Sequence, residues 1–96
     1  VKDDLDKVVE LIPDFACAYF NRANVSAKLS DFKSAIVDYT KAIEIDSRFA
    51  EAYFNRGLAR IYTGNGEEGI ADLSKAGELG VFQAYNLIKR FQMSGK

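Results

Sequence analysis

Few side chains in this sequence of 96 residues could carry out catalysis. Histidine is absent, which removes the commonest general base and any imidazole ligand for a metal. Cys17 is the single cysteine, and without a histidine to activate it a small apolar role on a helix face is favoured over a thiolate nucleophile. We therefore predict that the chain is not an enzyme and that it has no catalytic residues, no cofactor and no metal site.

A glycine-rich stretch over residues 64–69, with the sequence GNGEEG, could suggest a phosphate-binding loop. It lacks the Lys-Ser/Thr ending and a preceding strand, and its two glutamates would repel phosphate. A turn between two helices is the favoured interpretation, with Asn65 and Glu68 spaced as in a capping box. The acidic residues within 3–6 match no calcium loop and would complement the dipole of a helix start.

The composition is that of a globular domain, with 48% apolar and 28% charged residues. A net charge of −1 offers no general attraction to nucleic acid or anionic lipid, and no apolar run is long enough to span a membrane. We expect neither a nucleic-acid partner nor membrane insertion. The chain shows no secretion-signal pattern, and its lone cysteine suits a reducing compartment, which favours a cytoplasmic location without deciding it.

An internal repeat organises the chain, because the phrase AYFNR occurs at residues 18–22 and again at 52–56, 34 residues later. A period of this length is typical of a supersecondary unit stacked on copies of itself. The same step aligns further pairs: Phe15 with Phe49, Ala16 with Ala50, Ile36 with Ile70, Asp38 with Asp72, Lys41 with Lys75, Ala42 with Ala76 and Glu44 with Glu78. Upstream, Asp4, Lys7 and Glu10 align with Asp38, Lys41 and Glu44, so an earlier, partial repeat precedes them.

Apolar residues recur at spacings of three and four between turn signals, which predicts helices rather than strands. The expected helices cover residues 2–12, 15–29, 31–46, 48–63, 66–79 and 81–93. We predict a single domain over 1–96, taken from a longer chain. Its parts are the second helix of a partial repeat (1–14), two repeats (15–48 and 49–80) and a capping helix (81–96).

Small residues occupy matching positions in the two repeats, Ala23 and Ala35 in the first and Gly57 and Gly69 in the second. A glycine within a helix costs about 1 kcal/mol relative to alanine, so two of them require an offsetting gain. Close approach of the two helices of a repeat would supply that gain. We expect a tight crossing there, and we expect Gly57→Leu to be strongly destabilising.

The pattern of small and large residues resembles the tetratricopeptide repeat, a helix–turn–helix unit of 34 residues. The residues that carry the resemblance are Tyr19, Ala23, Ala35, Tyr39 and Ala42 in the first copy, and Tyr53, Gly57, Gly69, Leu73 and Ala76 in the second. The resemblance implies an all-α fold, a right-handed α–α superhelix of about six helices. Arg22, Ser26, Arg56 and Arg60 depart from the family's usual apolar or aromatic residues, and their role stays open.

The resemblance also implies that the first helix of each repeat lines a concave, peptide-binding groove. Its groove positions fall on Cys17, Phe20, Asn21, Asn24 and Ala27, and then on Glu51, Phe54, Asn55, Leu58 and Ile61. Asparagine can read a peptide backbone through its donor and its acceptor. Phe20 and Phe54 either face the groove or pack between repeats. Asn21 and Asn55 stand at the asparagine position of the family's carboxylate clamp, but Glu51 replaces its lysine, so we predict no clamp.

These observations favour a non-catalytic protein–protein interaction module that binds a peptide or a partner helix in the concave groove. The alternative is a structural spacer or a self-association element of a larger repeat protein. In that case a homodimer would form through the N-terminal half-repeat, whose apolar residues Val1, Leu5, Val8, Val9, Leu11 and Ile12 lack a preceding helix to cover them.

Overall fold

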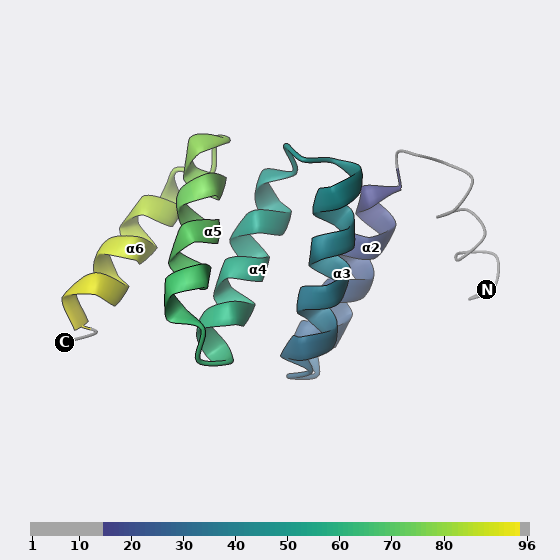
Figure 1. Ribbon diagram of the computed structural model, residues 1–96, viewed down its shortest axis with the longest axis horizontal. Coiled ribbons are helices and arrows are strands. Elements are labelled where there is room, and N and C mark those ends of the chain that lie inside the picture. Colours follow the sequence, from purple (N-terminus) through teal and green to yellow (C-terminus); the bar gives the residue numbers. More distant parts are fainter. Residues whose placement is uncertain (1–14, 95–96) are drawn as a thin grey trace.

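The computed structural model describes residues 15–94, which form helices joined by short turns (Figure 1). The helices are α2 (Ala16–Lys28), α3 (Phe32–Ile45), α4 (Ala50–Tyr62), α5 (Gly66–Glu78) and α6 (Gln83–Ser94). The all-α prediction is confirmed, and each of these helices begins and ends within about two residues of its expected bounds, the usual uncertainty of helix ends. The helix expected over 2–12 lies outside the described residues. None of the described helices is long and apolar enough to cross a membrane.

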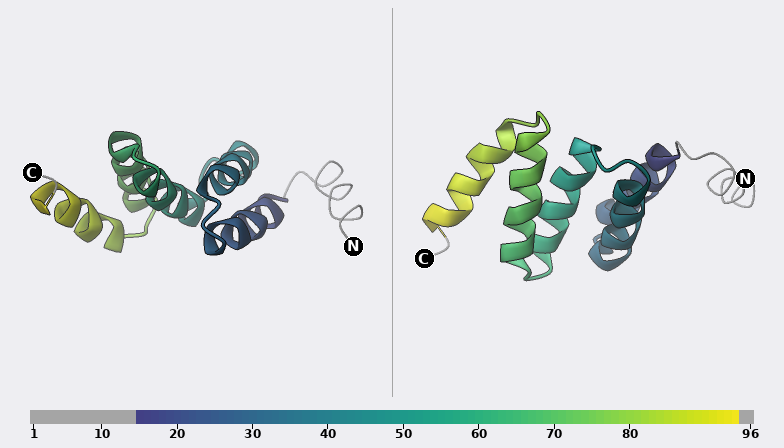
Figure 2. Two further views of the ribbon diagram at one scale, coloured as in Figure 1. Left: turned by 90° about the horizontal axis from the view of Figure 1, so that it is seen from below. Right: turned by 45° about the horizontal axis from the view of Figure 1, so that its top comes forward.

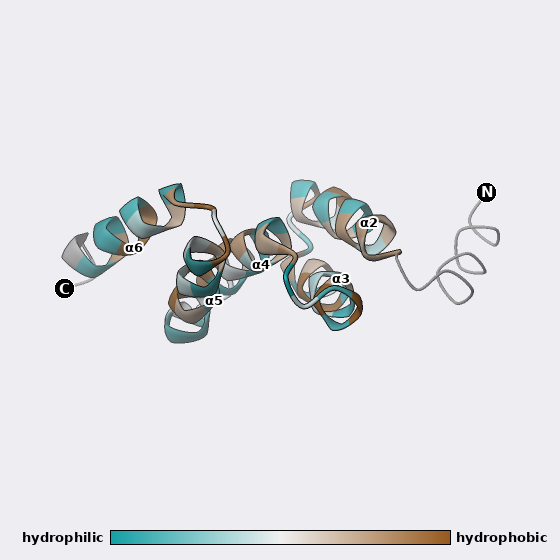
Figure 3. Ribbon diagram, turned by 90° about the horizontal axis from the view of Figure 1, so that it is seen from above, coloured by the Kyte–Doolittle hydropathy of each residue, from teal (hydrophilic) through white to brown (hydrophobic). Residues whose placement is uncertain are grey.

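The helices form two layers, with α2, α4 and α6 on one side and α3 and α5 on the other (Figure 2). Within the first layer α4 lies at the floor of a shallow concave face that α2 and α6 flank (Figure 3). Hydrophilic and hydrophobic bands alternate along the helices in Figure 3, as expected where each helix buries one stripe of its surface. The layering places one face of α4 at the centre of the concave side.

The tight crossing predicted between α4 and α5 is present. A Cβ atom built on Gly57 would lie 2.7 Å from the backbone oxygen of Gly69, and one built on Gly69 would lie 2.6 Å from the backbone oxygen of Gly57. Neither position therefore has room for a side chain. In the first repeat, Ala23 and Ala35 occupy the equivalent places and are fully buried.

Aromatic and aliphatic side chains fill the space between the layers around a framework of buried alanines. Tyr39 and Leu73 are the largest fully buried side chains. The ring of Phe20 packs against Phe49 and Tyr39, with centroids 4.8 and 5.8 Å apart. Phe54 packs against the cluster around Leu73. Both phenylalanines are half-buried, so each contributes to packing and keeps part of its ring exposed.

The arginines that depart from the family pattern form ion pairs inside each repeat. The Arg22 guanidinium donates two hydrogen bonds to the Asp38 carboxylate, at 2.8 and 3.1 Å. Arg56 donates two to Asp72, both at 2.9 Å. Asp38 and Asp72 are buried, and a buried carboxylate requires a charged, hydrogen-bonded partner. These arginines therefore neutralise carboxylates in the core, which answers the question of their role.

The second repeat extends this ion pair into a network. Arg60 also donates to the Asp72 carboxylate, at 2.8 Å, and Arg56 donates a further bond to the hydroxyl of Thr40, at 3.1 Å. Thr40 belongs to α3, so Arg56 connects the second repeat to the first. Ser26 stands in the first repeat where Arg60 stands in the second, so the network is not reproduced there.

The turns between paired helices differ in their capping. Asp31 accepts a hydrogen bond from the Ser34 backbone N–H at 3.3 Å and so caps α3. The equivalent Asn65 makes no capping bond; its amide donates to the Thr63 hydroxyl at 3.3 Å. The capping box predicted at Asn65 and Glu68 is therefore wrong, because the asparagine side chain bonds backward into the turn.

Candidate functional site

One face of α4 presents four of the predicted groove residues together. Glu51, Phe54, Asn55 and Leu58 follow one another at helical spacing, so they line a single stripe along the helix. Glu51 is exposed, and the other three are half-buried. The stripe lines one hollow toward α2 and another toward the start of α6, so it forms the middle of the candidate site.

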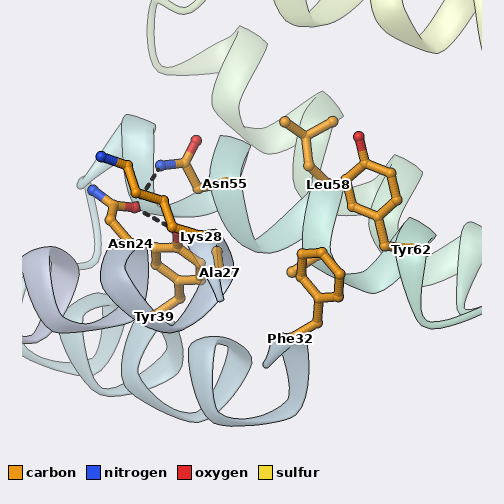
Figure 4. A pocket seen from close by; sticks show the side chains of 9 residues that line it. Asn24, Ala27, Lys28, Phe32, Tyr39, Asn55, Leu58 and Tyr62 are labelled. Carbon is orange, nitrogen blue, oxygen red and sulfur yellow. Dashed lines mark hydrogen bonds between the residues drawn. The ribbon is translucent and has the colours of Figure 1, made fainter. Parts of the chain in front are cut away.

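A cleft of about 550 Å³ lies between α2 and α4, with α3 beneath it (Figure 4). Its walls are mostly apolar, and two asparagines stand at one end. The lining residues are Asn24, Ala27 and Lys28 from α2, Phe32 and Tyr39 from α3, and Asn55, Leu58, Ala59 and Tyr62 from α4. Binding pockets commonly combine apolar walls with a few placed polar groups of this kind.

Asn24 links the three helices at the polar end of the cleft. Its side-chain oxygen accepts hydrogen bonds from the Tyr39 hydroxyl and from the Asn55 amide, the latter at 3.0 Å (Figure 4). Burial raises the pKa of the Tyr39 hydroxyl, an effect that the nearby Asn55 amide partly offsets. The hydroxyl thus stays protonated near neutral pH and remains a donor to Asn24.

These bonds use the side-chain oxygen of Asn24 and the amide nitrogen of Asn55. The Asn24 amide nitrogen and the Asn55 side-chain oxygen have no hydrogen-bond partner among residues 15–94. One is a donor and the other an acceptor, which is the complement of a peptide unit. The sequence placed both residues in the groove, whereas the bond between them follows from the side-by-side packing of α2 and α4.

An aromatic pair stands at the opposite end of the cleft. The rings of Phe32 and Tyr62 stack with centroids 5.1 Å apart and an angle of 25° between their planes. Tyr62 is 69% exposed. Neither residue was among the groove positions expected from the sequence, and Lys28 was also missed. All three residues lie near helix ends, which the sequence did indicate. The start of α3 and the ends of α2 and α4 meet at one edge of the molecule (Figure 1).

A second hollow, of about 450 Å³, lies between α4 and the start of α6. Its lining residues are Phe20, Glu51, Phe54, Asn55, Gly80, Val81 and Gln83. We call it the acidic hollow, because Glu51 is the one charged side chain in that lining. Asn55 lines both the cleft and the acidic hollow, so the two adjoin along α4.

Three of the expected groove residues lie elsewhere. Cys17 and Asn21 line a separate hollow on α2 together with Val25, so the structure does not bring them to the Asn24–Asn55 pair. Ile61 packs against Gly69 at the crossing of α4 and α5. Within residues 15–94 no group of three or more His, Cys, Asp or Glu side chains is arranged to hold a metal ion.

Comparison with known proteins agrees with this architecture. The family model of the tetratricopeptide repeat matches residues 16–49. The matched segment covers α2 and α3, the first of the two repeats. The resemblance seen in the sequence is confirmed, and the described fold is a tetratricopeptide-repeat solenoid.

Among solved structures, the chain is similar to the first tetratricopeptide-repeat domain of Spaghetti (RPAP3) bound to the HSP90 peptide SRMEEVD. The two chains are 26% identical, with a TM-score of 0.82 over 96% of this chain and 75% of the other. No curated protein sequence matches the chain.

Proposed function

We propose that the chain is a non-catalytic protein-interaction module whose concave face binds an extended peptide along α4. The observation that carries the proposal is the Asn24–Asn55 pair, which leaves one donor and one acceptor unused at the mouth of a mostly apolar cleft. The Asn24 amide donates to a peptide carbonyl, and the Asn55 oxygen accepts from a peptide N–H. Both contacts are to the peptide backbone, so they hold a segment without reading its sequence.

Selectivity for a side chain comes from the apolar end of the cleft. Phe32 and Tyr62 are already stacked on each other, so little further ordering is needed when an apolar side chain packs between them and Leu58. The aromatic rings provide a large apolar area with few rotatable bonds. The peptide is thus anchored by one side chain and aligned by its backbone.

The similar RPAP3 domain supports a peptide as the ligand, since that domain is bound to one. The expected absence of a carboxylate clamp stays a prediction. It rests on Glu51, a carboxylate at the position where the clamp requires lysine. We therefore propose the same class of ligand, a peptide, held by contacts of a different kind.

A selection followed by binding measurements tests the proposal. A phage library of random heptapeptides is selected on the parent chain, and the affinities of the selected peptides are then measured for Asn55→Ala and Leu58→Ala. We expect each variant to lose about tenfold, since a lost hydrogen bond or a truncated apolar contact costs about 1.4 kcal/mol. Asn86→Ala, an exposed asparagine on α6 outside both linings, should bind as the parent does. Unchanged affinity in both groove variants would exclude this face as the site.

Self-association is a second candidate, favoured by exposed apolar residues at the C-terminal end of α2. Val25 on α2 and Leu29, the residue that follows the helix, are 58% and 76% exposed. A homodimer through the N-terminal half-repeat stays a prediction, because residues 1–14 lie outside the described part. Sedimentation equilibrium over a wide concentration range tests it, and a monomer throughout would contradict it.

A further inference from the structure

The cleft and the acidic hollow carry opposite charges. Glu51 is the one charged side chain lining the acidic hollow, and Lys28 is the one charged side chain lining the cleft. Both are exposed. Neither makes an ion pair or a hydrogen bond with another residue in the described range 15–94. Each charge is therefore available to a ligand that lies along α4.

The separation of these sites is set by the helix. Leu58 and Tyr62 follow Glu51 by seven and eleven positions, which at about 1.5 Å per residue is about 10 to 17 Å along the axis. An extended peptide advances about 3.3 Å per residue. A peptide side chain in the cleft and another beside Glu51 therefore lie about three to five residues apart.

We propose that the groove selects peptides that carry a lysine or arginine beside Glu51 and an apolar side chain, three to five residues away, in the cleft. This inference rests on the proposed function and specifies its ligand. The basic side chain donates to the Glu51 carboxylate, and Gln83 in the same lining offers an amide oxygen as a further acceptor. Lys28 in the lining of the cleft disfavours a basic residue there, so a basic side chain is favoured only in the acidic hollow beside Glu51.

The same charges act against an acidic peptide. The segment SRMEEVD bound by the RPAP3 domain carries more acidic than basic residues. An acidic side chain placed in the acidic hollow would meet a carboxylate of the same sign. The groove is thus expected to differ from that domain in the charge that it selects.

Glu51 also has an ordinary structural role, which the experiment must separate from ligand selection. It lies in the first turn of α4, where a negative charge complements the helix dipole. Glu67 holds the same place in the first turn of α5, is also exposed, and belongs to the layer away from the concave face. Glu67→Lys is therefore the matched control for Glu51→Lys.

The test is a selection from one random-heptapeptide phage library on the parent chain, on Glu51→Lys and on Glu67→Lys. We expect the parent and Glu67→Lys to enrich lysine or arginine three to five residues from an apolar residue. Glu51→Lys should keep the apolar preference and enrich aspartate or glutamate at the other position. Replacing the basic residue of a selected peptide by glutamine should weaken binding to the parent about two- to fivefold, the size of an exposed ion pair.

The outcomes distinguish the two proposals. Selection of an apolar residue with no charge preference, or the same charge preference on the parent and on Glu51→Lys, overturns this inference and leaves the proposed function standing. An acidic preference on the parent overturns it as well. Failure to enrich any peptide on the parent counts against the proposed function and this inference together. Melting midpoints of the three chains show whether each is folded during selection.

Discussion

The two repeats use the same 34-residue register but close it with different side chains. In the first repeat alanines occupy the helix crossing, whereas in the second glycines do, and their backbones are in contact. The ion pairs of the buried carboxylates also differ, because the pair in the second repeat is more shielded from water. The Arg22 side chain beside Asp38 is 40% exposed, whereas the Arg56 side chain beside Asp72 is 12% exposed and a second arginine joins it. The repeat thus sets which positions meet, while a few residues decide whether a side chain fits at the crossing and how far the ion pair is shielded from water.

Filling the glycine crossing should have the largest effect. In Gly57→Leu the new side chain meets the backbone of α5, which cannot rotate away, so α4 and α5 must separate. We expect the free energy of unfolding to fall by about 3 kcal/mol or more, the upper range for overpacking. Urea or thermal unfolding measures the change.

Gly66→Ala is the control for that variant, since a Cβ on Gly66 would meet nothing within 4 Å. It should leave stability unchanged or raise it by up to about 1 kcal/mol, because alanine favours the helix. If Gly57→Leu unfolded at the same urea concentration as the parent, the crossing of α4 and α5 would have room for a side chain. The difference drawn between the two crossings would then be wrong.

Removing the buried carboxylates should produce an intermediate and unequal effect. Asp72→Ala leaves Arg56 and Arg60 facing each other with little access to water, and we expect a loss of about 2 to 3 kcal/mol. Asp38→Ala should cost about 1 kcal/mol, because the more exposed Arg22 can turn toward solvent. Both are measured by urea unfolding at one salt concentration. Equal losses would remove the distinction between the repeats drawn from their ion pairs.

Removing the residues before α3 and α5 should give the smallest difference between the repeats. Here the larger loss of stability should fall on the first repeat. Asp31→Ala removes the capping bond of α3 and should cost about 1 kcal/mol. Asn65→Ala removes no capping bond from α5, so its effect should be close to zero. Thermal unfolding of the two variants beside the parent checks this. A larger loss for Asn65→Ala would show that the second turn is capped in solution.

The helices and the glycine crossing could be predicted from the sequence because both depend on local spacing. The paired glycines were informative, since a helix carries them only where something offsets their cost. The two arginine–aspartate ion pairs could also have been predicted from the sequence. Arginine and aspartate recur 16 residues apart in both repeats, and Arg22 and Arg56 hold positions that the family keeps apolar. Opposite charges repeated at the same interval could have been read as partners.

Only some of the residues that line the candidate site were predicted from the sequence. The family resemblance placed Glu51, Phe54, Asn55 and Leu58 in the groove, and their helical spacing is consistent with one shared face of α4. Ile61 was expected beside them, yet it packs against Gly69 at the crossing with α5. Phe32, Tyr62 and Lys28 were missed, since they come from three helix ends that only folding brings to one edge.

The 34-residue register, the helices and the small residues at their crossings follow from the amino-acid order, because they depend on spacing along one or two helices. How the asparagines are used depends on the packing of three helices. Asn24 meets Tyr39 and Asn55, which lie 15 and 31 residues away in the chain. Whether those side chains bond to one another or to a ligand depends on the distance and angle at which α2, α3 and α4 pack. Packing alone therefore left one donor and one acceptor without a partner among the described residues at the polar end of the cleft.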